Sequence, residues 1–273
     1  MHGTIPVLLQ VPHAGLESFF DSSDIETGRI AEEMGAAADL NTDWIARLAS
    51  SAMEGTPYLL QSNMTRMECD VEKPRMRTDD DMGAIYRTGM GGLEDRLYSC
   101  EIPQKTIDYR IGALYEPYHR MFGSMVREMV ERFGFAAIIS IHSHGSGWAC
   151  YGTCSDDADI RIIANDEADG SMVGSIISHE EKNQRRSCSI RTVSSGAFTP
   201  RGMGHDSRIH PIMLEFHKDT YMDGRMPMYA SMDSLGMFIA HLSSRMLDVL
   251  DSAHLDRLSA ARPETMIPAA DTR

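Results

Sequence analysis

The stretch from Phe135 to Gly147 constrains the fold of this chain more than any other. An apolar, β-branched run from Ala136 to Ile141 ends abruptly in His142, and small and polar residues follow. A short continuous apolar run of this kind is typical of a buried strand in a parallel sheet. In open α/β sheets, ligands bind outside the carboxyl ends of the strands. We therefore expect His142 to lie where a functional site would be found.

Length and charge favour a single domain that binds a small molecule. The chain has 273 residues and a formal charge of -14, so it lacks the excess of Lys and Arg that binds nucleic acid. It contains no apolar stretch of transmembrane length, and its first residues do not show the basic pattern expected of a leader. Its five scattered cysteines are not the pattern expected of a disulfide framework. We expect one domain over residues 1–262, a flexible tail over 263–273, a cytoplasmic location, and no nucleic-acid or membrane partner.

Strand-like and helix-like patterns alternate along the chain. Strands are expected over residues 6–11, 56–61, 136–141, 148–153, 160–164, 189–193 and 209–216, and helices from residue 44 and over 103–133, 166–182 and 229–251. Pro211 indicates an edge strand or a bulge near the start of the 209–216 strand. The alternation predicts an α/β fold with a mixed, mostly parallel central sheet flanked by helices.

Four side chains at strand or helix ends could carry chemistry. His13 follows the first strand, His142 ends the strand of residues 136–141, Glu215 lies near the end of the 209–216 strand, and Asp43 opens a helix. Two imidazoles and one carboxylate with an open fourth position compose a catalytic zinc site, and a further carboxylate can act as general base. Each residue alone has a structural alternative, since Asp43 could equally serve the helix dipole.

Five short motifs, in order, resemble the N-formylglutamate amidohydrolase (deformylase) family. They are Pro12-His13-Ala14-Gly15, Thr42-Asp43-Trp44, Thr65-Arg66 through Asp70 to Pro74, Ile141-His142-Ser143, and Ile212 to Met222. The resemblance implies a phosphorylase/hydrolase-like sheet, similar to that of zinc carboxypeptidases. It also implies metal-dependent hydrolysis of an N-formyl or other N-acyl amide of a small, amino-acid-like carboxylate substrate.

Carried over residue by residue, the resemblance assigns roles to the same side chains. His13, Asp43 and His142 would bind Zn²⁺ or another divalent metal, and Glu215 would be the general base. Glu17 is a rival for the carboxylate ligand, although its spacing from His13 is H-x3-E. Whether Asp43 or Glu17 binds the metal stays open, with Asp43 preferred.

A substrate that carries carboxylates calls for bidentate arginines. Arg66 matches the family motif and is the first candidate for a catalytic and substrate-binding arginine, although a salt bridge with Asp70 is an alternative. Arg201 is the second candidate, and Thr199 could donate a hydrogen bond beside it. His144 could contact the substrate or lie solvated in a loop.

Four residues depart from the family pattern: Ser140, Glu72, Lys73 and Pro200. Ser140 stands where the family usually has Asp two residues before the histidine, and outer partners of this kind tune metal affinity. Glu72-Lys73 replaces the usual Asn-Arg, so the acyl group and amine of the substrate stay open. Two alternatives remain: a zinc carboxypeptidase-like or aspartoacylase-like deacylase, and a non-catalytic binding protein derived from the fold. The metal and the oligomeric state also stay open.

Overall fold

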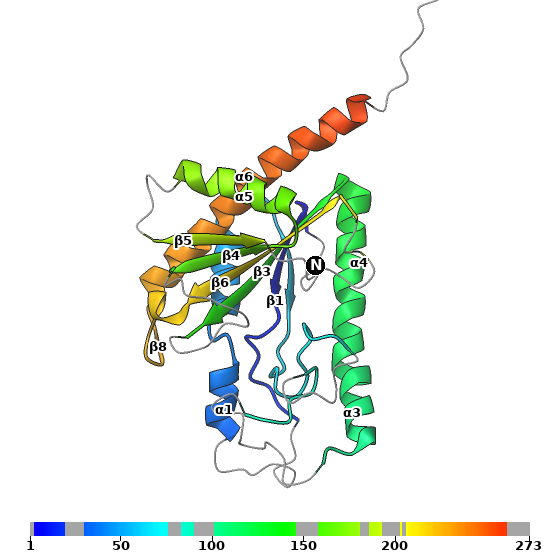
Figure 1. The fold of residues 1–273 in the computed structure, drawn as a ribbon, viewed down its shortest axis with the longest axis vertical. Coiled ribbons are helices and arrows are strands. Elements are labelled where there is room, and N and C mark those ends of the chain that lie inside the picture. Colours follow the sequence, from blue (N-terminus) through cyan, green and yellow to red (C-terminus); the bar gives the residue numbers. More distant parts are fainter. Residues whose placement is uncertain are drawn as a thin grey trace, which may run out of the picture.

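A computed structural model describes residues 3–19, 30–75, 83–89, 101–145, 158–180, 186–192, 203 and 206–260. Within them, a six-stranded sheet lies between helices (Figure 1). Its strands are β1 (Val7–Val11), β2 (Tyr58–Gln61), β3 (Ala136–His144), β4 (Ile160–Ala164), β5 (Cys188–Thr192) and β6 (Ile209–His217). The spatial order is β2-β1-β3-β6-β4-β5.

The sheet is mixed. Strands β2, β1, β3 and β6 are parallel to their neighbours, β4 is antiparallel to β6, and β5 is parallel to β4. The chain leaves β1 towards β2 on one side and returns to β3 on the other, which makes the carboxyl ends of β1 and β3 a topological switch point. The predicted α/β class, with a mostly parallel sheet flanked by helices, is confirmed.

Helices cover both faces of the sheet. They are α1 (Ile30–Ala37), α2 (Thr42–Ala52), α3 (Gln104–Arg110), a π-helical turn (Ile111–Tyr115), α4 (Glu116–Phe133), α5 (Glu167–Glu180) and α6 (Tyr229–Ala260). A 3-10 turn (Lys218–Thr220) and the small strands β7 (Met222–Asp223) and β8 (Met226–Pro227) link β6 to α6. None of the described helices has the length and apolar character needed to cross a membrane.

The side-chain alternation of the strands sorts apolar and polar residues between the two faces. In β3, Ile139 and Ile141 join the core beneath α2, α5 and α6, whereas Ile138 joins the core beneath α4. Because neighbouring side chains point to opposite faces, Ser140 and His142 lie on the α4 side with Ile138. His142, the candidate site residue near the end of β3, therefore lies on the α4 face of the sheet.

Two details differ from the sequence predictions. Pro211 does not mark an edge strand, because β6 lies between β3 and β4; the β4 ladder begins at Ile212, one residue later, and so leaves the proline outside it. The single predicted helix over 103–133 contains the π-helical turn in its first half. The strand expected over 148–153 and the tail over 263–273 lie outside the described residues, and the single-domain boundary at 262 stays a prediction.

Candidate functional site

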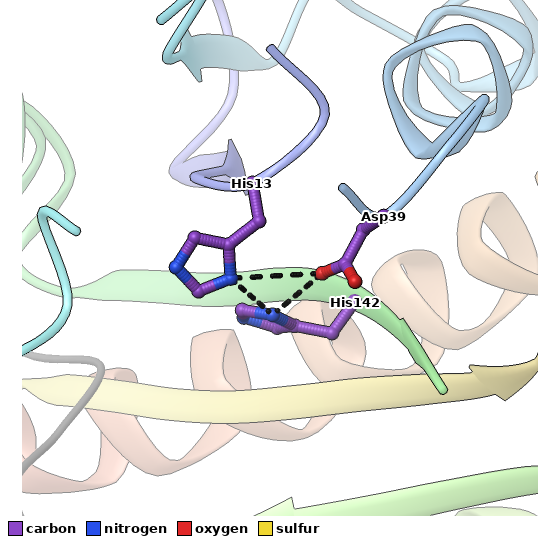
Figure 2. A group of neighbouring side chains, drawn as sticks. All are labelled: His13, Asp39 and His142. Carbon is purple, nitrogen blue, oxygen red and sulfur yellow. Dashed lines mark hydrogen bonds and ion pairs between the residues drawn. The ribbon is translucent and has the colours of Figure 1, made fainter. Parts of the chain in front are cut away.

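Two histidines meet at the switch point between β1 and β3. His13 follows β1 by two residues and His142 lies near the end of β3. Their Nδ1 atoms are 3.3 Å apart, and both side chains are buried (Figure 2). Neighbouring parallel strands end at the same edge, which is why residues far apart in sequence come together here.

The carboxylate that completes this group belongs to Asp39. Its Oδ2 atom lies 3.1 Å from Nδ1 of His142 and 3.6 Å from Nδ1 of His13 (Figure 2). Across the part of the chain that the structure describes, these three residues form the one group of His, Cys, Asp and Glu side chains able to hold a metal ion. Sequence reasoning missed Asp39, which lies in the loop between α1 and α2 and follows no strand.

Neither carboxylate expected from the sequence belongs to this group. Asp43 lies in the first turn of α2, four residues after Asp39, and the helix dipole favours a negative charge there. Glu17 is exposed, and its backbone forms a bridge with Met64. The structure thus brings Asp39, and neither Asp43 nor Glu17, to the two histidines, because the turn before α2 approaches them. Which carboxylate binds a metal stays a prediction.

Hydrogen bonds from the motif residues fix the Asp39 loop. The Asp39 amide donates to the His13 carbonyl at 2.9 Å, and Thr42 Oγ1 donates to the Asp39 carbonyl at 2.7 Å. Lys218 Nζ donates to the Ala38 carbonyl and Tyr221 Oη to the Leu40 carbonyl, each at 2.9 Å. Residues from the second and the fifth motif thus hold the backbone on both sides of Asp39.

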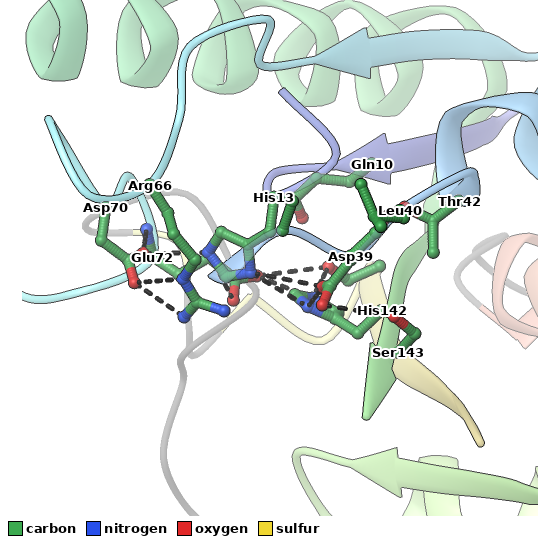
Figure 3. Close-up of polar contacts among 12 residues, drawn as sticks. Gln10, His13, Asp39, Leu40, Thr42, Arg66, Asp70, Glu72, His142 and Ser143 are labelled. Atoms are coloured by element: carbon green, nitrogen blue, oxygen red, sulfur yellow. Dashed lines mark hydrogen bonds and ion pairs between the residues drawn. The ribbon is translucent and has the colours of Figure 1, made fainter. Parts of the chain in front are cut away.

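The outward nitrogen of His13 contacts a second carboxylate. Nε2 of His13 lies 2.9 Å from Oδ1 of Asp70, which is fully buried (Figure 3). Asp70 Oδ2 accepts hydrogen bonds from Arg66 Nε and Nη2, at 3.1 and 2.8 Å, and from Tyr86 Oη at 3.1 Å. Burial alone would raise the pKa of Asp70, but Arg66 and His13 hold it well below its usual range. Asp70 therefore stays ionised and fixes the His13 ring.

The outward nitrogen of His142 also contacts a carboxylate. Nε2 of His142 lies 2.9 Å from Ser140 Oγ and 3.2 Å from Glu72 Oε1. Ser140 Oγ in turn donates to Glu72 Oε1 at 3.3 Å. A metal-binding histidine almost always donates its second ring nitrogen to a partner of this kind.

The donor set suits a cation. Acceptors at both Nε2 atoms hold a ring proton there, so Nδ1 of His13 and of His142 faces Asp39 and can bind a metal when it carries no proton. Burial alone would lower the pKa of His142, but the charge of Glu72 and a hydrogen bond with Asp39 raise it to about 10. Burial would raise the pKa of Asp39, but its hydrogen bonds to the two histidines hold it well below its usual range. The centre is thus built to hold positive charge.

Glu215 lies beside this centre. It pairs with His142 in the β3–β6 register, and Arg161 Nη1 is 3.9 Å from its Oε2. Burial raises the pKa of Glu215, against the smaller effects of His142 and Arg161. A partly buried carboxyl whose pKa is raised is suited to accept a proton and to return it.

The other predicted residues have different outcomes. Arg66 forms a salt bridge with Asp70, which was the alternative to a catalytic and substrate-binding role. His144 ends β3, where its ring packs edge-on against His217 at 4.9 Å between centroids. Thr199, Arg201 and the departure at Pro200 lie outside the described residues.

A family model described as N-formylglutamate amidohydrolase matches residues 5–222. The crystal structure of N-formylglutamate amidohydrolase from Ralstonia eutropha JMP134 is similar, with a TM-score of 0.72, 15% identity, and coverage of 91% of this chain and 95% of that one. A gene product of Agrobacterium tumefaciens matches with a TM-score of 0.63 and 16% identity over 94% and 91% of the two chains.

A metallo-carboxypeptidase from Burkholderia cenocepacia matches more weakly, with a TM-score of 0.37, 10% identity, and coverage of 92% of this chain and 57% of that one. No curated protein matches the sequence at a significant level. At these identities, the likeness to the two closer structures shows the fold alone.

Proposed function

Because this chain belongs to the N-formylglutamate amidohydrolase family, we propose that it is a zinc-dependent hydrolase of an N-formyl or other N-acyl amide. The proposed substrate is small and amino-acid-like, with a free carboxylate. The observation that carries the proposal is the convergence of His13, Asp39 and His142 beside Glu215. Two imidazoles and one carboxylate leave a coordination position open, as catalytic zinc sites do.

His13 and His142 would hold the metal through Nδ1, and Asp39 through a carboxylate oxygen. A zinc ion in such a site lowers the pKa of water and polarises a carbonyl group. Asp70 orients the His13 ring from behind, and burial of all three ligands keeps bulk water from competing for them.

Glu215 would move the protons. Its carboxylate takes a proton from the attacking water, and the resulting carboxylic acid returns that proton to the nitrogen of the departing amine. The pKa of Glu215, raised by burial, suits both steps. Arg161, 3.9 Å away, would limit how far that pKa rises.

Substrate recognition is assigned to the residues that the sequence indicated. Arg201 and Thr199 would bind the substrate carboxylate, and Arg66 would add its charge while it holds Asp70. His144 would contact the substrate at the end of β3. The family residues Asn and Arg are replaced by Glu72 and Lys73, so the proposal covers N-acyl amino acids and not N-formylglutamate alone.

Hydrolysis of N-formyl, N-acetyl and N-carbamoyl amino acids, measured as released amine, tests this function. We expect turnover that needs about one zinc ion per chain. Glu215→Gln should keep the zinc and reduce turnover roughly 10²–10⁴-fold, the usual effect of a general base. Asp219→Asn is the matched control, because this carboxylate lies in the same motif but its side chain is 71% exposed.

Two results would overturn the proposal. Activity that survives complete removal of zinc would refute the metal chemistry, and full activity of Glu215→Gln would refute the base.

A further inference from the structure

Two departures from the family pattern meet at one atom. Ser140 Oγ and Glu72 Oε1 both lie within hydrogen-bonding distance of His142 Nε2, at 2.9 and 3.2 Å. The Ser140 hydroxyl also donates to Glu72. Nε2–H of His142 is thus shared between a hydroxyl oxygen and a carboxylate, although the two residues are 68 positions apart.

Strand geometry explains which contact an aspartate at position 140 would make. Residues 140 and 142 of β3 point to the same face, and the Ser140 side chain already reaches Nε2 of His142. An aspartate at position 140, which the family pattern has, would bring a carboxylate to the same nitrogen. Here that carboxylate is missing from position 140, and Glu72 brings one where the family pattern has Asn.

We propose, on the basis of the proposed zinc-dependent function, that Glu72 and Ser140 together replace that aspartate and position the metal ligand His142. Glu72 is a positioning residue in this role: it fixes the ring and its tautomer, so that the Nδ1 lone pair faces Asp39 and His13. The local charge is unchanged, because one carboxylate is absent at position 140 and another is present at position 72.

The contacts of Glu72 favour this role over metal binding or substrate recognition. Oε1 contacts Nε2 of His142, the ring nitrogen opposite the one that faces Asp39. Oε2 lies 3.8 Å from Nε2 of His13, again on the outward side. The Glu72 side chain is 11% exposed, so it lies behind the ligands and not on a solvent-facing surface.

The experiment is a double-mutant cycle on zinc affinity. The variants are Glu72→Asn, Ser140→Asp and the double variant, which restores both family residues. Zinc affinity of the metal-stripped protein is measured by competition with a chromogenic chelator. Glu72→Asn should weaken zinc binding ~10–100-fold, as loss of such a partner does. The double variant should regain most of that affinity, since residues that share one atom are energetically coupled.

Thermal melting of each zinc-free variant shows whether a loss of zinc affinity comes from the positioning of His142 or from a destabilised fold. Lys73→Arg, which restores the neighbouring family residue and keeps its charge, is the matched control and should leave zinc affinity unchanged. Should Glu72→Asn fail to fold, Glu72→Gln preserves the side-chain length and serves in its place. Wild-type zinc affinity in the Glu72 variant, or no recovery in a folded double variant, would overturn the inference and leave the proposed function standing. A wild-type protein that binds no zinc would overturn both.

Discussion

At the residue scale, three positions, Asp39, Thr42 and Asp43, decide which carboxylate meets the two histidines. Asp39 and Asp43 lie on either side of the start of α2 at Thr42, and the Thr42 side chain bonds the Asp39 carbonyl. The loop on the amino side of Thr42 therefore approaches His13, while Asp43 begins the helix. A helix-start motif identifies this region but does not tell which of its two aspartates faces the site.

The pair gives a matched test of the metal centre. Asp39→Asn should lower zinc affinity by more than the roughly 10–100-fold that an outer partner contributes, because it removes a proposed ligand. Asp43→Asn should leave affinity unchanged, since Asp43 lies outside the group. Zinc titration of both metal-stripped variants checks this prediction. The opposite ranking of the two variants would restore Asp43 as the ligand.

At the element scale, the position of His13 depends on the turn after β1 as much as on the strand itself. Gly15 follows His13 by two residues, and a Cβ atom there would collide with the backbone of Asn63 and Met64. Backbone hydrogen bonds join the two segments, from Glu17 N to the Asn63 carbonyl and from Thr65 N to the Glu17 carbonyl, both at 2.9 Å. The glycine of the first motif therefore lets the His13 turn approach the chain that leads to Asp70.

Gly15→Ala should separate these segments. Overpacking of this kind costs about 1–3 kcal/mol, so we expect a lower melting temperature together with weaker zinc binding. Gly35→Ala in α1 is the control, because no atom lies within 4 Å of its added Cβ and alanine favours a helix. Thermal melting with and without zinc measures both effects. Unchanged zinc affinity in Gly15→Ala would mean that the close approach does not position His13.

The elements themselves were largely predictable, because most of the strands are short apolar runs with turn residues at their ends. The role of Pro211 was not, since the local sequence does not show that β4 begins to pair only at Ile212.

At the scale of the whole molecule, buried charges at one edge of the sheet couple stability to pH. In the metal-free protein, Glu72 and Asp39 outweigh burial and raise the pKa of His142 from 6.5 to about 10. A group with a raised pKa stabilises the fold fully below its unfolded pKa and loses that effect as the pH rises through the folded pKa. Asp39 and Asp70, whose pKa values are lowered, stabilise the fold above about 3.8 and lose that effect in stronger acid.

The free energy of unfolding of the metal-free protein should therefore fall as the pH rises from 6.5 to about 10. Denaturant unfolding at the two ends of this range measures it. The zinc-loaded protein is the control and should lose less stability, because the metal replaces the proton that His142 gives up. Equal alkaline losses with and without zinc would contradict the assignment of His142 to the centre.

The sequence by itself determined the α/β class, most of the strands, and the two histidines and Glu215 at strand ends, because strand formation and side-chain alternation depend on neighbouring residues. Only the tertiary structure decided which carboxylates complete the centre. Asp39, Asp70 and Glu72 lie in segments between strands, and contacts across 57 to 103 residues bring them to His13 and His142. The stretch around His142 indicates the edge of the sheet where the candidate site lies, but long-range packing selects the partners of His142.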